Sequence, residues 1–165
     1  MKSKIIQILG AKNSGKTTLI EKLVRELSSR NYKVGTVKHT SHDHDFDRPG
    51  TDSDKHVRAG SEATVILSPG KFILHADREN LHDSEMLLSE IMKDKDIILW
   101  EGQGISGIPI VRLINTGELS LSDIDNNTLA IVSDDYKDSN IPVYSTANIS
   151  SLIDLILKQV IRFNH

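Results

Sequence analysis

Two kinds of apolar pattern alternate along this chain. Short, mostly apolar runs are typical of buried strands, whereas apolar residues spaced three and four apart are typical of amphipathic helices. The short runs lie at 5–9, 33–38, 64–67, 71–75, 96–100, 108–113, 128–132 and 141–144, and the helical spacings at 19–27, 86–92 and from 148 or 150 to 160. This alternation predicts an α/β fold with a mostly parallel sheet flanked by helices.

Two segments interrupt the alternation. The runs 64–67 and 71–75 flank the turn residues Ser68, Pro69 and Gly70, which predicts an added β-hairpin. Residues 39–60 are polar and rich in histidine and aspartate, and a loop of this length inside a compact domain is more often functional than idle. There is no linker or repeat, and 165 residues suit one core, so we expect residues 1–165 to form a single domain.

Residues 10–18 read GAKNSGKTT, directly after the first apolar run and directly before the first helical pattern. This is a complete phosphate-binding loop (P-loop) in its expected context. Gly10 and Gly15 permit a tight turn whose N–H groups bind phosphate, Lys16 adds a positive charge, and Thr17 offers a hydroxyl to Mg²⁺. The other expected contacts are Lys12, Asn13, Ser14 and Thr18. Because chance produces such a match in fewer than about one chain in a hundred of this length, we predict a nucleoside triphosphate site rather than a glycine-rich turn beside a surface lysine.

A phosphate-binding loop needs a second acidic element to hold Mg²⁺ or its water shell. The apolar run DIILW at 96–100 is followed by Glu101 and Gly102. Ligands of open parallel sheets collect at the carboxyl ends of strands, so Glu101 is predicted to lie near the P-loop. The alternative is a glutamate that merely ends a strand at the solvent edge.

The net charge, the cysteine content and the lengths of the apolar stretches limit which partners and which compartment the protein can have. The formal net charge is −3 and no segment concentrates lysine and arginine on one face, which argues against nucleic acid as a partner. The absence of cysteine excludes disulfides, thiolate zinc sites and cysteine nucleophiles. No apolar stretch suits a signal peptide or a membrane span, so we expect a cytoplasmic protein with no membrane partner.

Four segments form a specific pattern along the chain: GAKNSGKTTLIEKL, VKHTSHDHDFDRPGTDSDKHVRAGS, DIILWEG and the late strand that ends in VSDD. Together they resemble the molybdopterin-guanine dinucleotide biosynthesis protein B (MobB) family. The second is the most specific, because the family has a strand ending in KH, further histidines, a D-x-P-G-x-D-S run and then R-x-A-G. One departure is visible: the family usually continues E-G-F-K, whereas this chain has Gln103 and Gly104 after Glu101 and Gly102.

The resemblance implies a GTP-binding, weakly GTP-hydrolysing accessory protein, similar to the small GTPases of metallocentre assembly. It also implies a partnership with the guanylyltransferase that joins GMP to molybdopterin, contact with a molybdopterin-type ligand, and a homodimer. The departure keeps the metal-side carboxylate but removes an aromatic residue and a lysine.

The middle segment should emerge at the same sheet edge as the P-loop, because it follows the second strand. Asp52 is a candidate Mg²⁺ ligand or water-orienting group and Asp47 a weaker one, with turn and capping roles around Pro49 as the alternative. Lys38 and Arg58 flank the segment and are candidates for contact with an anion or for solvated surface charge.

Three histidines in this segment, His39, His42 and His44, invite a transition-metal interpretation, as in a GTP-dependent metallochaperone. Without a supporting thiolate they are equally polar loop groups that bind a phosphate or a pterin.

Base choice depends on the segment after the apolar run 128–132. The guanine-reading N-K-x-D element is absent, and Ser133, Asp134 and Asp135 stand in its place. Asp134 could accept hydrogen bonds from guanine N1–H and N2–H₂, which adenine does not offer, although a strand-ending turn explains these residues equally well.

For hydrolysis, Lys16 and the loop amides are predicted to stabilise charge on the phosphates while Thr17, Glu101 and Asp52 hold Mg²⁺. No arginine finger is evident, and Gln103 is the one nearby candidate for orienting water, so we expect slow turnover. The alternatives are a small-molecule or nucleotide kinase, which the single arginine in residues 112–140 disfavours, and a module whose bound GTP only stabilises a docking surface.

Overall fold

The computed structural model describes residues 4–40, 47–80, 83–115, 124–136 and 140–162. The chain forms two compact units, Met1–Thr40 with Met92–His165 and Ser41–Ile91. The expectation of one domain over residues 1–165 stays a prediction, and each unit is described by itself.

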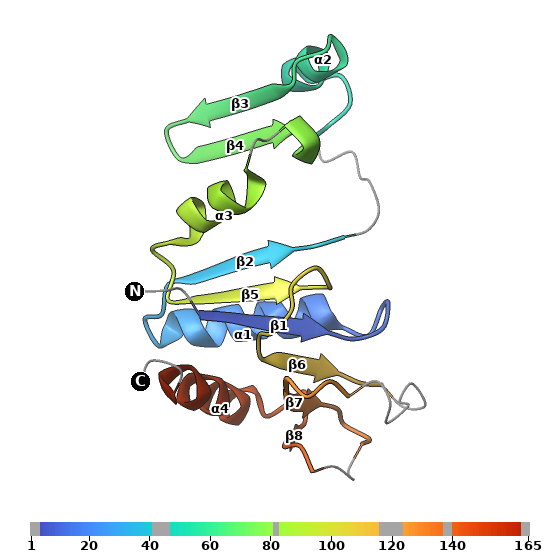
Figure 1. Cartoon of the computed structure of the whole chain (residues 1–165), viewed down its shortest axis with the longest axis vertical. Coiled ribbons are helices and arrows are strands. Elements are labelled where there is room, and N and C mark those ends of the chain that lie inside the picture. The colour runs from blue at the N-terminus through green and yellow to red at the C-terminus, as the bar shows by residue number, and fades with distance from the viewer. Residues whose placement is uncertain (1–3, 41–46, 81–82, 116–123, 137–139, 163–165) are drawn as a thin grey trace. The chain divides into compact units, whose positions relative to one another are not determined.

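A six-stranded sheet forms the first unit (Figure 1). All of its strand pairs are parallel, in the order β2-β5-β1-β6-β7-β8. The strands are β1 (Lys4–Leu9), β2 (Val34–Lys38), β5 (Ile97–Glu101), β6 (Ile110–Leu113), β7 (Thr128–Val132) and β8 (Val143–Tyr144). The predicted α/β fold is confirmed, and strand β5 lies directly between β1 and β2.

Helices α1 (Lys16–Ser29) and α4 (Ile149–Arg162) pack together against the sheet. Their buried residues include Leu23, Leu27, Leu152 and Ile153, all fully buried. The strands contribute alternate residues to the same core, namely Ile6, Ile8, Ile97, Leu99, Val111, Leu113, Ala130 and Val132. Because side chains alternate along a strand, this list fixes which residues face α1 and which face the other way.

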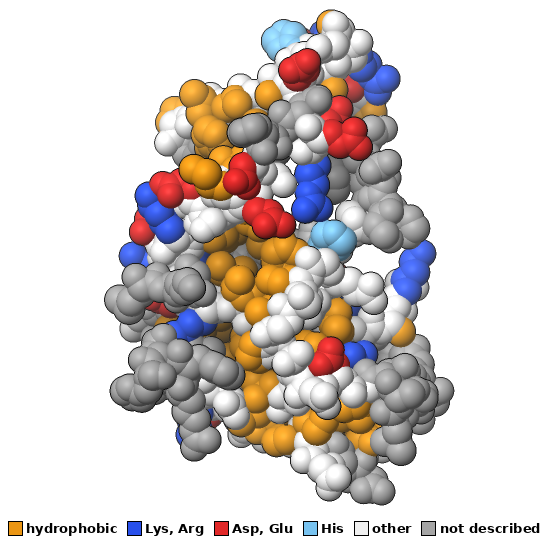
Figure 2. All heavy atoms as spheres, in the orientation of Figure 1, with side chains coloured by type: hydrophobic (Ala, Val, Ile, Leu, Met, Phe, Trp, Pro, Cys, Tyr) orange, Lys and Arg blue, Asp and Glu red, His pale blue; other side chains and the backbone are white. Residues whose placement is uncertain are grey.

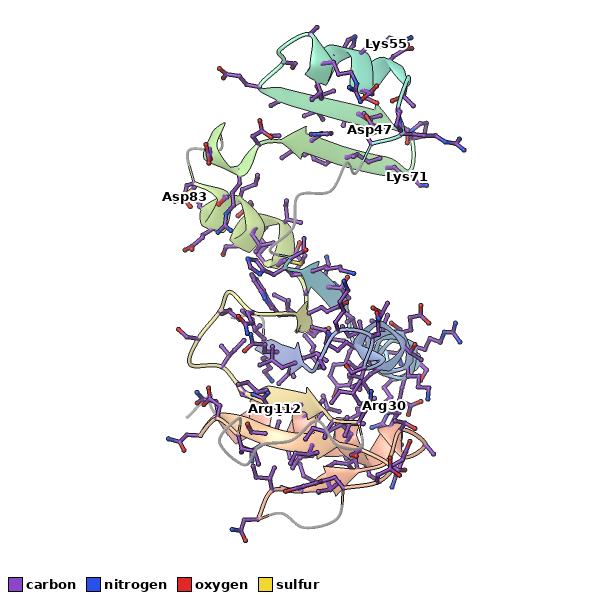
Figure 3. The ribbon with its side chains drawn as sticks, turned by 90° about the vertical axis from the view of Figure 1, so that its right-hand side faces the viewer. Arg30, Asp47, Lys55, Lys71, Asp83 and Arg112 are labelled. Carbon is purple, nitrogen blue, oxygen red and sulfur yellow. The ribbon has the colours of Figure 1, made fainter. Side chains whose placement is uncertain are left out.

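Arg30, which caps α1 at its end, ties the two helices together (Figure 3). Its guanidinium donates to Glu26 in α1 and to Asp154 and Ser150 in α4. No helix within the described ranges is both long and apolar enough to cross a bilayer.

The second unit contains the predicted hairpin. Strands β3 (Ala63–Ser68) and β4 (Lys71–Ala76) pair antiparallel and form a separate two-stranded sheet. A short 3₁₀ helix (Arg78–Asn80) and helix α3 (Ser84–Met92) follow. Five large apolar side chains of the hairpin are exposed, and Figure 2 shows orange side chains gathered over it. They are Val65, Ile66, Leu67, Phe72 and Ile73.

Helix α2 (Asp52–Arg58) lies within the segment expected to be a loop, which corrects that expectation. It buries none of its residues, so no apolar stripe marks it in the sequence. The sequence features that indicate this helix are instead an N-cap residue and charged residues in its first and last turns. Thr51 accepts a hydrogen bond from the Asp54 N–H, acids lie in the first turn, and Lys55 and Arg58 lie in the last.

Candidate functional site

The P-loop connects β1 to α1 in the first unit. Gly15 adopts φ 96° immediately before the first residue of the helix, Lys16. Asn13 also has a positive φ of 62°, and the Ser14 N–H donates to the carbonyl of Ala11 at 3.2 Å. The backbone therefore turns sharply and leads directly into the helix N-terminus, whose first N–H groups are suited to bind an anion.

Gly10 is packed too closely to carry a side chain. A Cβ at this position would lie 2.7 Å from the carbonyl oxygen of Leu113 and 2.8 Å from Oγ of Ser14. That Ser14 oxygen is buried, and it has no hydrogen-bond partner among the described residues. A buried hydroxyl that lacks a partner in the loop fits a site built for a further polar group.

The ammonium group of Lys16 folds back over the loop. Its Nζ donates to the carbonyl of Gly10 at 3.0 Å and to that of Ala11 at 2.5 Å. Both acceptors are neutral backbone oxygens, and a phosphate oxygen would be a stronger partner for the ammonium because it carries charge. Of the remaining predicted loop contacts, Ser14 is buried, while Lys12, Asn13, Thr17 and Thr18 are exposed.

Glu101 lies beside the start of α1, as the sequence predicts. It ends β5, whose neighbour β1 leads into the P-loop. Its Oε1 lies 3.4 Å from Thr17 Oγ1 and 3.8 Å from Lys38 Nζ, and 14% of its side chain is exposed. Mg²⁺–oxygen distances of about 2.1 Å place two neighbouring ligand oxygens about 3 Å apart, so Thr17 and Glu101 fit a shared Mg²⁺.

Asp134 follows β7 at the same edge of the sheet. Its carboxylate accepts two hydrogen bonds from Thr146, one from the backbone N–H at 2.9 Å and one from the hydroxyl at 2.7 Å. The hydroxyl bond is the main cause that holds the pKa of Asp134 below its usual value, and the backbone bond adds to it. Ser133 forms the turn, since its Oγ accepts from the N–H groups of Asp135 and Tyr136.

Thr146 is the residue that sequence reasoning missed. It follows β8, the edge strand next to β7, and its carbonyl accepts from Lys22 of α1. A short apolar run ending in Tyr144 was the available signal, because a strand in a parallel sheet delivers the next residues to the edge that carries Asp134.

Asp52 and Asp47 both belong to the second unit. The side chain of Asp52 is 91% exposed and forms an ion pair with Lys55 at 3.0 Å. Asp47, labelled in Figure 3, accepts from the Arg48 N–H at 2.7 Å and from the Thr51 hydroxyl at 3.2 Å. The Ser53 hydroxyl is the main cause that holds the pKa of Asp47 below its usual value. Asp47 therefore caps a turn, and the metal role of Asp52 stays a prediction.

Arg58 has an internal partner as well. Its Nε donates to Asp54 at 2.8 Å, one helical turn earlier in α2. The pKa of Asp54 is held low mainly by the Gly50 N–H and further by this guanidinium. Arg58 thus forms an ion pair with Asp54 within α2.

His39 packs against other side chains in the first unit, whereas His42 and His44 lie outside the described residues. The His39 ring stacks on Trp100 with centroids 6.3 Å apart. In the described part of the chain, no three His, Asp or Glu side chains converge as metal ligands would. Gln103 lies in the turn after β5, where its carbonyl accepts from the indole N–H of Trp100 at 2.8 Å.

A parallel sheet whose first strand leads through a glycine-rich loop into a helix defines the class of P-loop nucleotide-binding folds. The adjacent strand ending in Glu101 completes that arrangement. The chain belongs to the molybdopterin guanine dinucleotide synthesis protein B (MobB) family, whose sequence model matches residues 5–134.

Relatives in this family span bacteria and archaea. The molybdopterin-guanine dinucleotide biosynthesis adapter protein of Escherichia coli K12 is 32% identical over 152 residues, covering 88% of this chain and 86% of that one. A putative adapter protein of the same description from Methanocaldococcus jannaschii is 29% identical over 133 residues, and the match covers 81% of this chain and 56% of the archaeal protein. The crystal structure of Bacillus subtilis MobB is similar, with a TM-score of 0.74, 27% identity and coverage of 95% and 98%.

Proposed function

We propose that this protein binds GTP with Mg²⁺, hydrolyses it slowly, and acts as an accessory protein in the biosynthesis of molybdopterin guanine dinucleotide in the cytoplasm. The observation that carries the proposal is the juxtaposition of Thr17 and Glu101 beside Lys16, at the N-terminus of α1. The role in cofactor biosynthesis is supported by family membership and by the relatives' description as adapter proteins.

Each residue of the site has a distinct part in this proposal. The P-loop N–H groups and Lys16 hold the β and γ phosphates and stabilise the charge that develops during hydrolysis. Thr17 and Glu101 would hold Mg²⁺, which neutralises phosphate charge when bound. Asp52 is kept as a further candidate for the metal or for the attacking water. Turnover is slow because charge stabilisation depends mainly on a single lysine.

Asp134 is the proposed guanine-reading residue. A carboxylate has about four acceptor positions, so the two bonds from Thr146 leave room for N1–H and N2–H₂ of guanine. An aspartate is ionised at neutral pH, as acceptance of both donors requires, and the bonds from Thr146 lower the pKa of Asp134 further. GTP is therefore favoured over ATP.

The proposed partners are the molybdenum cofactor guanylyltransferase, a molybdopterin-type ligand and a second copy of this chain. The homodimer has physical support in the second unit. Val65, Leu67 and Phe72 lie on one face of the hairpin, because Leu67 pairs with Phe72 and Val65 with Leu74. They are 48%, 73% and 64% exposed, and an isolated two-stranded sheet is marginal in water, so cover by a second copy would stabilise it.

Calorimetric titration with GTP and ATP, with and without Mg²⁺, tests the nucleotide site. We expect GTP to bind at least about tenfold more tightly than ATP, which corresponds to about 1.4 kcal/mol. Lys16→Ala should abolish binding, whereas Thr17→Ala and Glu101→Gln should lose mainly the dependence on Mg²⁺.

Lys33→Ala is the matched control. This exposed lysine precedes β2 and so lies at the amino end of the parallel strands, whereas the P-loop lies at their carboxyl end. The proposal is wrong if the folded wild-type protein binds no purine triphosphate, or if Lys16→Ala binds as the wild type does. GTP binding without any GTP hydrolysis would favour a module whose bound GTP only stabilises a docking surface. Transfer of the γ-phosphoryl group to an acceptor other than water would favour a kinase.

A further inference from the structure

The turn after β5 is contacted by side chains on the face of the sheet opposite α1. Glu101 pairs with Lys38 in register and lies on the α1 side of the sheet, whereas Trp100 points to the other face beside Gln7 and Val37. His39 follows β2 and stacks its ring on Trp100 at 6.3 Å with the ring planes 23° apart. Trp100 in turn donates its indole N–H to the carbonyl of Gln103 at 2.8 Å.

Two glycines leave room for His39. Gly102 adopts φ 95°, and a Cβ there would lie 2.5 Å from the carbonyl oxygen of His39. A Cβ at Gly104 would lie 3.0 Å from Nε2 of the His39 ring, with two other ring atoms at 3.1 Å. The imidazole therefore fills the space over Gly104, and the His39 backbone lies against Gly102.

Backbone hydrogen bonds fix the same turn to the neighbouring strands. The His39 N–H donates to the Glu101 carbonyl at 2.9 Å, and the Gly102 N–H donates to the Ile8 carbonyl at 3.2 Å. The side chain of Gln7 donates to the Gly102 carbonyl at 2.8 Å. Strands β1, β2 and β5 thus all contribute to the position of the residue next to Glu101.

We infer that His39 is a positioning residue for Glu101: its ring, wedged between Trp100 and Gly104, holds the turn so that the carboxylate is preorganised for Mg²⁺. The inference builds on the proposed nucleotide function and deepens it. It assigns the histidine a packing role in place of metal ligation. In this chain a side chain at position 104 would meet the imidazole.

The physical reason is the freedom of the turn. Gly102 and Gly104 have wide conformational choice, and each is restrained here by contact with His39. Without the ring, the turn samples other conformations. Binding of the metal must then order Glu101, and the entropy lost lowers the affinity for Mg²⁺. Groups that orient a metal ligand typically contribute 10–100-fold to metal affinity.

The test compares His39→Ala with His39→Phe, which keeps a planar ring and removes both nitrogens. The readout is the Mg²⁺ concentration that half-saturates the tightening of GTP binding. We expect it to rise about tenfold or more in His39→Ala and to stay near the wild-type value in His39→Phe. GTP affinity in the presence of a metal chelator should be the same in all three proteins. His56→Ala, at an exposed histidine of α2, is the matched control.

Trp100 supplies a second readout that needs no nucleotide, since it is the only tryptophan in the chain. Its emission in the nucleotide-free protein should change in His39→Ala and in Gly104→Ala, whose Cβ displaces the ring. In the double variant, the effect of Gly104→Ala on Mg²⁺ dependence should be smaller than in the wild-type background, because the Cβ no longer meets the ring and only the strain of alanine at φ 95° remains.

Three results would overturn the inference. Equal losses in His39→Ala and His39→Phe would mean that an imidazole nitrogen acts directly, and wild-type Mg²⁺ dependence in both would mean that the ring positions nothing. Unchanged Trp100 emission in His39→Ala would show that the His39 ring does not restrain Trp100 and the turn after β5. A wild-type protein that binds no Mg²⁺-GTP would instead refute the proposed function, and with it the metal role, while the emission data still decide whether His39 holds the turn.

Discussion

Gly10 is the residue at which the P-loop has least room. Gly10→Ala places a Cβ 2.7 Å from a backbone carbonyl oxygen, which cannot move as a flexible side chain would. We expect a loss of about 1–3 kcal/mol in the free energy of unfolding, the usual cost of overpacking. Urea denaturation measures it. Gly70→Ala is the control, because a Cβ there meets nothing within 4 Å, and an equal loss in both variants would contradict the prediction.

The contact between Asp134 and Thr146 makes stability depend on pH. The pKa of Asp134 is lowered from 3.8 in the folded state, so its contribution is present at neutral pH and is lost as pH falls through the folded-state pKa. Thr146→Val removes the hydroxyl bond. We expect its melting temperature to lie below that of the wild type at pH 7 and the gap to shrink below about pH 4.

Thermal unfolding between pH 7 and pH 3 tests this expectation, with Thr146→Ser as the control that keeps the hydroxyl. A gap of constant size across that range would mean that Thr146→Val acts through packing and not through the carboxylate.

At the residue scale, the sequence predicts positions and leaves most contacts open. Glu101 could be placed near Thr17 because adjacent parallel strands end at one edge, a rule that needs no side-chain detail. The hydroxyl of Thr146 meets Asp134 across 12 residues, and His39 meets Gly104 across a larger separation. Such contacts depend on loop conformation after the sheet has formed, so local pattern carries little information about them.

Helix α2 shows the same limit at the scale of an element. The strands and the longer helices were predictable because each buries an apolar face with a regular period. This helix buries nothing, and its local stability comes from the Thr51 cap and from charges at both ends. The polar composition of residues 39–60, which contain this helix, instead predicts a loop.

The cap gives a prediction for α2. Thr51→Ala removes the acceptor for the Asp54 N–H and the hydroxyl that donates to Asp47 and to the Arg48 carbonyl. Loss of an N-cap costs about 1 kcal/mol, and we expect faster amide hydrogen exchange across 52–58. Thr51→Ser keeps the oxygen and should exchange as the wild type does. Unchanged exchange in Thr51→Ala would show that the charges alone hold the helix.

For the whole molecule, the proposed homodimer leads to a prediction about the hairpin. Leu67 and Phe72 pair across β3 and β4 and are 73% and 64% exposed, so a second copy that covers them removes both from water. Burial of a large apolar side chain contributes about 1.5–3 kcal/mol to the free energy of association. In a two-fold dimer each substitution is present in both copies, so its effect on the interface occurs twice.

A double variant, Leu67→Lys with Phe72→Lys, should therefore raise the dissociation constant of the dimer more than about a hundredfold. Sedimentation over a range of protein concentrations measures it, and circular dichroism checks that the fold is kept. Met86→Lys is the matched control, since this α3 side chain is 70% exposed but lies outside the hairpin. A hairpin variant that stays dimeric while Met86→Lys dissociates would move the interface to α3, because mutual repulsion between lysines disrupts only the surface that the two copies share.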